Sequence, residues 1–290
     1  MHARKSLHLA LICLFLIWPL HSVHADEAPI NVEEQLAADV KVGEAQWLKA
    51  DGNRFFAIYT KSTSGINKGG AIILPSMGNN PNWPDVIAPL RKTLPYHGWS
   101  TLSIDLPVPG KSADGFWQLK SYFTACRSRI ESAINYMQQQ GINNILLVGY
   151  GLGAVTAAVS VTGPDSLKVS GLAAISLGVP PGSDPKPYTP DLLQDIHIPV
   201  LDVFGSRDFS TVTATAAARL AAAHRGELAA QHAQQLDDAL KGSPQARLVT
   251  TDHNGYIAYR QLKLMGADHT FRGAEPTLIK RIEGWLKKHS

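Results

Sequence analysis

Short apolar runs alternate along this chain with longer stretches whose apolar residues recur at helical spacing. The short runs are continuous and bounded by glycine, proline or polar residues, which is typical of strands buried on both faces of a sheet. They cover residues 69–75, 99–107, 143–149, 169–178 and 198–205, and the helical patterns cover residues 84–98, 121–141, 154–163 and 211–240. This alternation predicts an α/β fold in which right-handed crossovers build a mostly parallel sheet with helices on both faces.

The two ends of the pattern complete this sheet. Residues 45–60 carry alternating aromatics on both sides of Asp51-Gly52, so they predict two strands joined by a turn. The segment 259–271 contains a last strand-like run with His269 just after it, and residues 276–289 predict a closing amphipathic helix.

Composition supports one globular domain. The chain has 290 residues, of which 44% are hydrophobic and 18% charged, so it can bury one substantial core and does not have the composition of a disordered protein. No internal repeat or Pro/Ser-rich linker is visible, so we expect a domain at residues 41–290 after a polar lead-in at 26–40. The alanine-rich stretch 211–240 predicts one or two helices, which either pack over the sheet or form a lid.

The first 25 residues resemble a secretory signal peptide. Arg4 and Lys5 precede an apolar run at 9–20, and small residues lead to Ala25, after which we expect cleavage. The run is too short to cross ~30 Å of hydrocarbon as a helix, so no transmembrane anchor is expected in the mature chain. The leader predicts export, to the periplasm or by secretion.

Charge and cysteine content exclude some partners. The chain carries 27 Lys and Arg against 24 Asp and Glu, and without Arg4 and Lys5 the excess falls to 25 against 24, so no nucleic-acid partner is expected. Cys13 belongs to the leader, which leaves Cys126 without a disulfide partner in the mature chain. Its helical, apolar surroundings predict a buried structural cysteine.

Residues with chemical potential follow several of the predicted strands. The carboxyl ends of parallel strands meet at one edge of a sheet, where ligands and catalytic groups gather. The residues placed there are Ser76 and Met77 after the run 69–75, the segment Gly149-Tyr150-Gly151-Leu152-Gly153, Asp208 after the run 198–205, and His269 after the last strand.

In this order of motifs the chain resembles the α/β-hydrolase fold, over nearly all of residues 45–288. In that family a strand ends in a G-x-S-x-G turn that presents a nucleophilic serine, followed along the chain by an acid and a histidine. Asp208 lies 57 positions after Gly151, and His269 lies 61 positions after Asp208. The resemblance implies that Asp208 and His269 are the acid and base, and that backbone N–H groups at Leu152 and around Ser76 and Met77 bind an oxyanion.

Glycine occupies the place of the nucleophile in this turn. Gly151 has no side chain that attacks a carbonyl, and loss of a triad nucleophile costs ~10⁶ in rate. Glycine also relieves the ~1–3 kcal/mol of backbone strain that a serine bears at such a turn. The G-x-G-x-G-A pattern resembles a group of exported bacterial α/β-hydrolase-like proteins without an established substrate.

A dinucleotide site is a competing interpretation of the same glycines. Gly149 to Ala154 also satisfy G-x-G-x-x-[GA], but such a site needs an acidic residue at the end of the next strand. The run 169–178 ends without one, and Asp165 comes before it. His253 has no matching ligand cluster, so we expect neither a metal nor a cofactor.

Two classes of function remain open. The missing nucleophile favours a binding or envelope-associated protein without serine-hydrolase activity, whose ligand is a small molecule or a protein. The retained Asp208 and His269 favour a hydrolase that uses a water in the space of the missing side chain or a non-standard nucleophile. The nearby hydroxyls of Ser76 and Ser206 are expected to bond local backbone groups, as serines in loops usually do. The acid and histidine could equally be a polar contact that holds two loops together.

Overall fold

The computed structural model describes residues 32–184, 188–240 and 259–289. The expected leader at 1–25 and His253 lie outside the described residues. A short helix, α1 (Val32–Ala38), forms in the polar lead-in before the sheet begins. No helix in the described ranges is long and apolar enough to cross a membrane.

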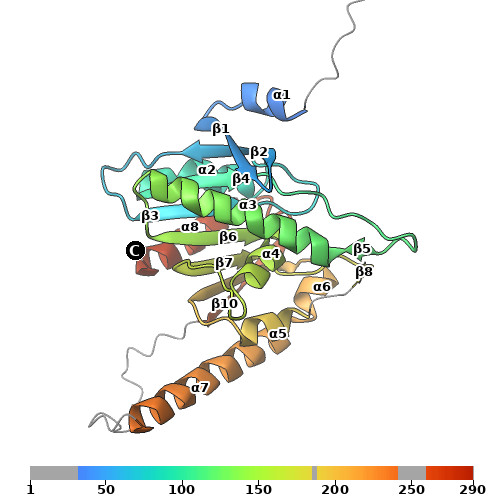
Figure 1. The fold of residues 1–290 in the computed structure, drawn as a ribbon, viewed down its shortest axis with the longest axis vertical. Helices are drawn as coiled ribbons and strands as arrows, with labels where there is room; N and C mark the ends of the chain where they lie inside the picture. The colour runs from blue at the N-terminus through green and yellow to red at the C-terminus, as the bar shows by residue number, and fades with distance from the viewer. Residues whose placement is uncertain (1–31, 185–187, 241–258, 290) are drawn as a thin grey trace, which may run out of the picture.

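One sheet of eight strands forms the centre of the protein (Figure 1). The first two strands of the order run antiparallel to their neighbours, and the other six are parallel to one another. This arrangement confirms the mostly parallel sheet predicted from the sequence. In spatial order the strands are β1 (Glu44–Ala50), β2 (Asn53–Thr60), β4 (Trp99–Ile104), β3 (Gly69–Leu74), β6 (Ile145–Tyr150), β7 (Gly171–Ile175), β9 (Val200–Arg207) and β10 (Tyr259–Asp268).

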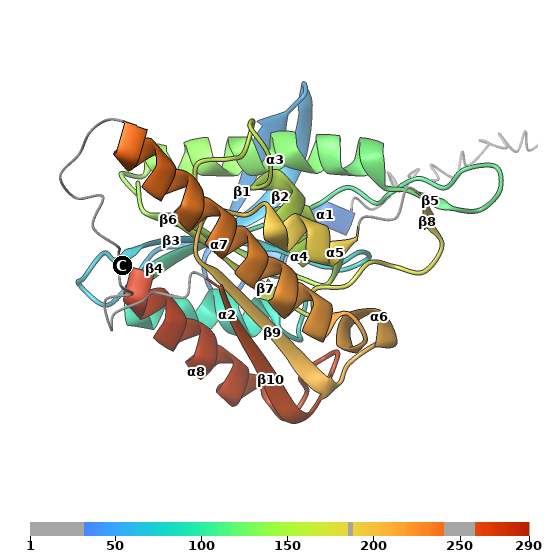
Figure 2. The ribbon, with the colours of Figure 1, turned by 90° about the horizontal axis from the view of Figure 1, so that it is seen from below.

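Helices cover both faces of the sheet (Figures 1 and 2). One face carries α3 (Leu119–Gln139), α4 (Leu152–Ser160), α5 (Thr189–Gln194) and α7 (Ala216–Leu240). The opposite face carries α2 (Ile87–Thr93) and α8 (Glu275–Leu286), which is followed by a 3₁₀ turn, η2 (Lys287–His289). Each layer has its own apolar cluster against the sheet, so the strands are buried on both sides.

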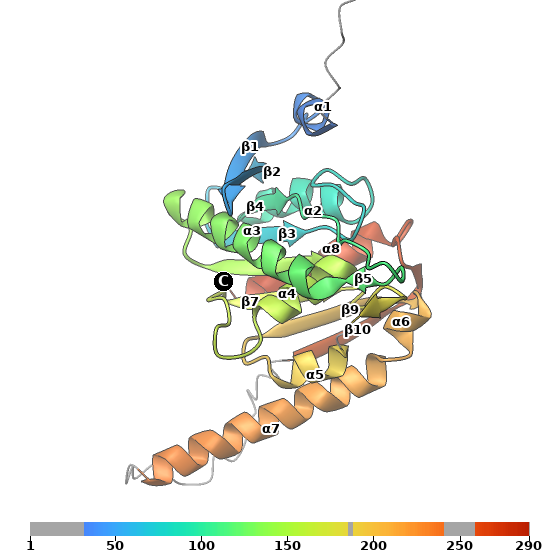
Figure 3. The same cartoon turned by 45° about the vertical axis from the view of Figure 1, so that its right-hand side comes forward.

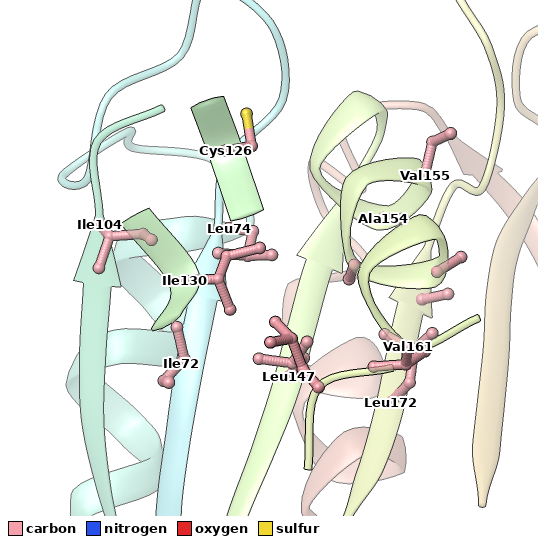
Figure 4. Close-up of a cluster of buried hydrophobic side chains, with 14 of the residues drawn as sticks. Ile72, Leu74, Ile104, Cys126, Ile130, Leu147, Ala154, Val155, Val161 and Leu172 are labelled. Atoms are coloured by element: carbon pink, nitrogen blue, oxygen red, sulfur yellow. The ribbon is translucent and has the colours of Figure 1, made fainter. Parts of the chain in front are cut away.

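Apolar side chains from the central strands fill the space under α3 and α4 (Figure 4). Ile72 and Leu147 on the sheet belong to one cluster with Ile130 on α3 and Val155 on α4, and all four side chains are fully buried. Cys126 lies in the same cluster, which confirms the predicted buried cysteine, and burial raises its pKa to about 12. Truncation of a side chain such as Leu147 to alanine would cost ~2–5 kcal/mol.

The helix predicted over 84–98 is shorter in the structure. It ends at Thr93 and continues as a 3₁₀ turn, η1 (Leu94–His97). Pro95 has no N–H to give to the carbonyl of Arg91, four residues earlier. The hydroxyl of Thr101 on β4 donates to that carbonyl instead, at 3.0 Å.

Some short elements were not predicted. The strands β5 (Trp117–Gln118) and β8 (Ser183–Asp184) pair in a two-stranded ribbon, and two residues are too few to show a hydrophobic period. The alanine-rich stretch forms a short α6 (Ser210–Thr213) and the long α7. The α7 helix packs on α5 and projects beyond the sheet at its far end (Figure 3).

Candidate active site

Five neighbouring strands end at one edge of the sheet, and each is followed by a residue of the candidate site. The strands are β3, β6, β7, β9 and β10, which lie side by side in that order. The residues are Ser76, two positions after β3, and Gly151, Ser176, Asp208 and His269, each directly after its strand. The structure therefore brings together the acid, the histidine and the glycine turn that the sequence placed at this edge.

Asp208 and His269 form a direct pair. Nδ1 of His269 lies 2.8 Å from Oδ1 of Asp208, whose side chain is fully buried. The same oxygen accepts the N–H of Phe209 at 2.8 Å, and Oδ2 accepts the hydroxyl of Ser176 at 2.5 Å. Burial raises the pKa of Asp208, but the hydrogen bonds from His269 and Ser176 outweigh it and hold that pKa below its ordinary value. Asp208 is therefore an ionised acceptor that fixes the imidazole.

Aromatic rings fix the plane of His269. The ring of Phe209 stacks on the imidazole with centroids 4.2 Å apart, and the ring of Tyr150 lies 5.1 Å away. The Tyr150 hydroxyl donates to the backbone carbonyl of His269 at 3.0 Å, and burial raises its pKa, which keeps it protonated. Because an ionised carboxylate only accepts, Nδ1 of His269 carries the proton of the Asp208 contact, which leaves Nε2 for a ligand.

An irregularity in the sheet aims His269 at the pocket. The pairing of β10 with β9 shifts register between Leu264 and Asp268, directly before the histidine. A Cβ on Gly205 would stand 2.4 Å from the carbonyl oxygen of Ala267, so glycine on β9 makes room for this irregular segment. Bulges next to active sites redirect side chains in this way.

The glycine turn between β6 and α4 is sharp. A Cβ on Gly149 would stand 2.5 Å from Cα of Ala154, and one on Gly153 would stand 2.3 Å from the carbonyl oxygen of Leu74. These two positions therefore exclude side chains. Gly151 has φ 55° and ψ −120°, a backbone conformation that costs a non-glycine residue ~1–3 kcal/mol.

The space of the missing side chain at Gly151 is filled by Ser76. A Cβ at residue 151 would stand 2.3 Å from Oγ of Ser76 and 3.8 Å from Cε1 of His269. Ser76 Oγ also accepts the N–H of Leu152 at 3.2 Å. The structure thus differs from the expectation that a water fills this space, and the N–H of Leu152 is bonded to Ser76. The role of Leu152 and Met77 as oxyanion donors stays a prediction.

A pocket of about 370 Å³ opens above these residues. Its walls are mainly apolar, and they include Trp83. Its lining comprises Ser76, Met77, Asn79, Trp83, Asp85, Tyr150, Gly151, Leu152, Ser176, Gly178, Val179, Pro180, Pro181, Phe209, Thr211, Val212, His269 and Thr270. The lining takes residues from α6 and none from the described side chains of α7.

Charge in the pocket is limited to few groups. Asp85 is the carboxylate that lines it beside His269, and no Lys or Arg of the described ranges lines it. Asp85 pairs with the exposed Arg272 at 3.3 Å. No group of three or more His, Cys, Asp or Glu that could hold a metal occurs among the described residues.

Sequence reasoning missed Ser176 and Asp85. Ser176 directly follows β7, as Asp208 follows β9, but the apolar run continues through Leu177 and Gly178, so the sequence does not reveal that the strand ends before Ser176. Asp85 lies in the stretch predicted to be helical, whereas α2 begins at Ile87. Ser206, the other hydroxyl near Asp208, accepts the N–H of Gly266 at 2.8 Å and is a backbone contact.

Solved structures similar to this chain share its fold. Est1E from Butyrivibrio proteoclasticus matches with a TM-score of 0.57 and 13% identity, over 84% of this chain and 98% of that chain. An alpha-beta serine hydrolase homologue from Coxiella burnetii matches with a TM-score of 0.53 and 19% identity, over 85% and 99%. The Pyrococcus furiosus esterase Pf2001 matches with a TM-score of 0.56 and 10% identity, over 85% and 92%. The protein therefore has the α/β-hydrolase fold.

Comparison with sequences places the chain in a family. The comparison with curated proteins gave no significant match. A known family matches residues 19–115 and 113–243, which together are more than half of the chain. The chain thus belongs to the family described as "Protein of unknown function (DUF3530)".

Proposed function

We propose that the protein is a hydrolase of small esters in which His269 is the general base and Asp208 orients it. One observation carries this proposal: the 2.8 Å contact between the buried Asp208 and His269, which lines a pocket together with Gly151. A base needs a partner that fixes its tautomer and a second ring nitrogen that is free to take a proton. His269 has both.

The arrangement around Asp208 supports a catalytic use over a simple loop contact. A contact that only held two loops together would need one hydrogen bond. Asp208 accepts three, from His269, Ser176 and the N–H of Phe209, and is held ionised without solvent. A buried carboxylate that is held ionised by several hydrogen bonds beside an imidazole is typical of catalytic sites.

The pocket favours neutral or cationic esters. Its volume of about 370 Å³ suits a small ligand, its lining is mainly apolar, and its carboxylate is Asp85. An anionic substrate would meet Asp85 with no lining Lys or Arg to balance its charge. The similar solved structures include the esterase Pf2001 and Est1E with bound ferulic acid, which supports esters as the substrate class to test first.

The test is turnover of a panel of p-nitrophenyl esters by the chain from Asp26 onward. We expect hydrolysis that falls at least 100-fold in His269→Ala and in Asp208→Asn, because either change removes the oriented base. His197→Ala is the matched control, since His197 is exposed and does not line the pocket. Equal rates in His269→Ala and the control would overturn the proposal.

A binding protein is the second candidate, and the Ser76 contact favours it. The hydroxyl of Ser76 already accepts the N–H of Leu152, so one predicted oxyanion donor is occupied within the protein. A site closed in this way would hold a ligand in the pocket without turning it over. Saturable binding of a short-chain alkyl ester by calorimetry, with no product formed, would support this role over the first.

The proposed place of action is the periplasm. The leader expected at residues 1–25 supports export, and a binding or hydrolytic role in the cell envelope would follow from it. N-terminal sequencing of the protein recovered from a periplasmic extract should begin at Asp26. A chain that starts at Met1 and stays with the cytoplasm would contradict this.

A further inference from the structure

We propose that Ser76 supplies the nucleophilic hydroxyl that Gly151 lacks. This inference rests on the proposed hydrolase function and names the attacking group within the same site. Ser76 comes from the loop after β3, whereas the glycine turn follows β6. The proposed nucleophile thus follows β3, the neighbour of β6 in the sheet, instead of β6 itself.

Position is the first argument for Ser76. Oγ of Ser76 and Cε1 of His269 both lie within 4 Å of the same point, the Cβ position of residue 151. The hydroxyl therefore lies beside the place that a serine side chain at residue 151 would occupy, and the imidazole lies near the same place. Ser76 is partly exposed and lines the pocket, so a substrate can reach it.

The hydrogen bonding of Ser76 is the second argument. Its Oγ accepts the N–H of Leu152, the first residue of the nine-residue helix α4. An N–H and a helix N-terminus both stabilise negative charge as it develops on this oxygen. Within the described part of the chain, no hydrogen bond is donated by this hydroxyl, so its proton is free to move toward His269.

Gly151 and Ser76 then form a matched pair. A side chain at residue 151 would displace Ser76 Oγ from this place, because its Cβ would stand 2.3 Å away. Glycine at 151 is required for a hydroxyl from residue 76 to stand there. Glycine at position 151 therefore has two reasons: it relieves backbone strain and it leaves room for the hydroxyl of Ser76.

The chemistry balances with ester and water alone. Ser76 Oγ bonds to the carbonyl carbon while its proton passes to Nε2 of His269, directly or through one water. The bond from that carbon to the alcohol oxygen breaks, and the alcohol leaves with the proton from His269. Water then attacks the acyl-serine, its proton moves to His269 and on to Ser76 Oγ, and the acid product leaves.

A fluorophosphonate probe on the mature chain tests this directly. The tryptic peptide at 69–91 contains Ser76 and no other Ser, Thr or Tyr, so an adduct on it is assigned without ambiguity. We expect one adduct per chain on this peptide, absent in Ser76→Ala and formed at least 10-fold more slowly in His269→Ala. Ser121→Ala is the control, since Ser121 is exposed on α3 away from the pocket.

Two outcomes separate this inference from the proposed function. Turnover that survives in Ser76→Ala but not in His269→Ala would overturn the nucleophile and leave the hydrolase, with water as the attacking group. An adduct on Ser76 without ester turnover would support the nucleophile and contradict the hydrolase. No adduct on the peptide at 69–91 would overturn the inference.

A cysteine variant covers the case in which Ser76→Ala does not fold. Ser76→Cys keeps the size of the side chain close to that of serine and introduces a thiol. Iodoacetamide should alkylate the introduced thiol at least 10-fold faster in the presence of His269 than in the His269→Ala background. Cys126 does not interfere, because it is buried and burial raises its pKa to about 12. Equal labelling rates in the two backgrounds would argue against activation by His269.

Discussion

Oγ of Ser76 stands 2.3 Å from the point that a Cβ on Gly151 would occupy, so the two residues cannot both carry their side chains into this space. The backbone of Gly151 adds a second constraint, with φ at 55°. The conformation and the contact both exclude other residues at position 151 while Ser76 stays in place.

The first prediction concerns Gly151→Ser. This change should lower the free energy of unfolding by at least ~1–3 kcal/mol, because serine adopts this backbone with strain and also displaces Ser76. Urea denaturation of the variant and the parent protein measures the difference. A folded variant with unchanged stability would contradict both the strain and the contact.

The exchange variant Ser76→Gly with Gly151→Ser extends this test. Removing the Ser76 side chain relieves the contact and leaves only the backbone strain, so the exchange variant should be more stable than Gly151→Ser alone. It also restores a hydroxyl at the turn beside His269. We expect hydrolysis of p-nitrophenyl acetate at least 10-fold above that of Ser76→Gly alone, and equal rates would show that the base cannot reach residue 151.

The sheet and the edge that carries the site could be predicted from the sequence, because both follow from local pattern. Each central strand is a continuous apolar run, and Asp208 and His269 stand directly after such runs. Parallel strands bring their carboxyl ends together, so position along the chain was enough to place the pair at one edge.

The contact between Ser76 and Gly151 could not be predicted in the same way. It depends on the rotamer of Ser76 and on how closely two loops approach, which no local pattern encodes. Ser176 was missed for a different reason, since a serine within an apolar run does not reveal that the strand has ended. Its bond to Asp208 again joins two separate strand ends.

The second prediction concerns the buried ion pair behind the site. Arg219 on α7 binds Asp202 on β9 through Nε at 2.7 Å, and both side chains are fully buried. The hydroxyl of Tyr259 on β10 donates to the same carboxylate at 2.7 Å. Arg219→Met should therefore lower the free energy of unfolding by ~3–5 kcal/mol, because it leaves a buried charge without its partner.

Thermal or urea unfolding measures this loss, and the exposed Arg225 on the same helix gives a matched control as Arg225→Met. The control should change stability by less than ~0.5 kcal/mol. The double variant Arg219→Met with Asp202→Asn should recover part of the loss, since it removes the unpaired charge. If the double variant is less stable than Arg219→Met alone, the charge is not the cause.

The third prediction concerns pH and Ser176. The folded protein holds the pKa of Asp208 below its ordinary, unfolded-state value of ~3.9. The ionised carboxylate therefore stabilises the fold at pH values above ~3.9, and this stabilisation is lost as the pH falls through the lower folded-state pKa. Ser176→Ala removes one of the hydrogen bonds that lower this pKa. The variant should lose that contribution at a higher pH than the parent protein.

Unfolding by urea at pH values between about 3 and 7 measures this shift. At neutral pH the variant should also be less stable by ~1–3 kcal/mol, because Oδ2 of Asp208 stays buried without its donor. Ser121→Ala serves again as the control, since Ser121 is exposed and far from Asp208. Parallel pH curves for Ser176→Ala and the parent protein would show that Ser176 does not affect the ionisation of Asp208.

The last prediction concerns the charge of the substrate. Asp85 lines the pocket with its side chain 16% exposed, and its partner Arg272 lies outside the lining and is 75% exposed. The carboxylate therefore acts on a bound ligand with little compensation by Arg272, which solvent screens.

For a pair of p-nitrophenyl esters of similar size, one with a trimethylammonium group and one neutral, kcat/KM should favour the cationic ester. Asp85→Asn should lower that preference at least 3-fold and leave kcat/KM for the neutral ester within 2-fold, because it removes the charge and keeps the shape of the side chain. Arg272→Gln should raise the preference, since it removes the one cation paired with Asp85 among the described residues. An unchanged ratio in both variants would mean that Asp85 does not face the bound ester.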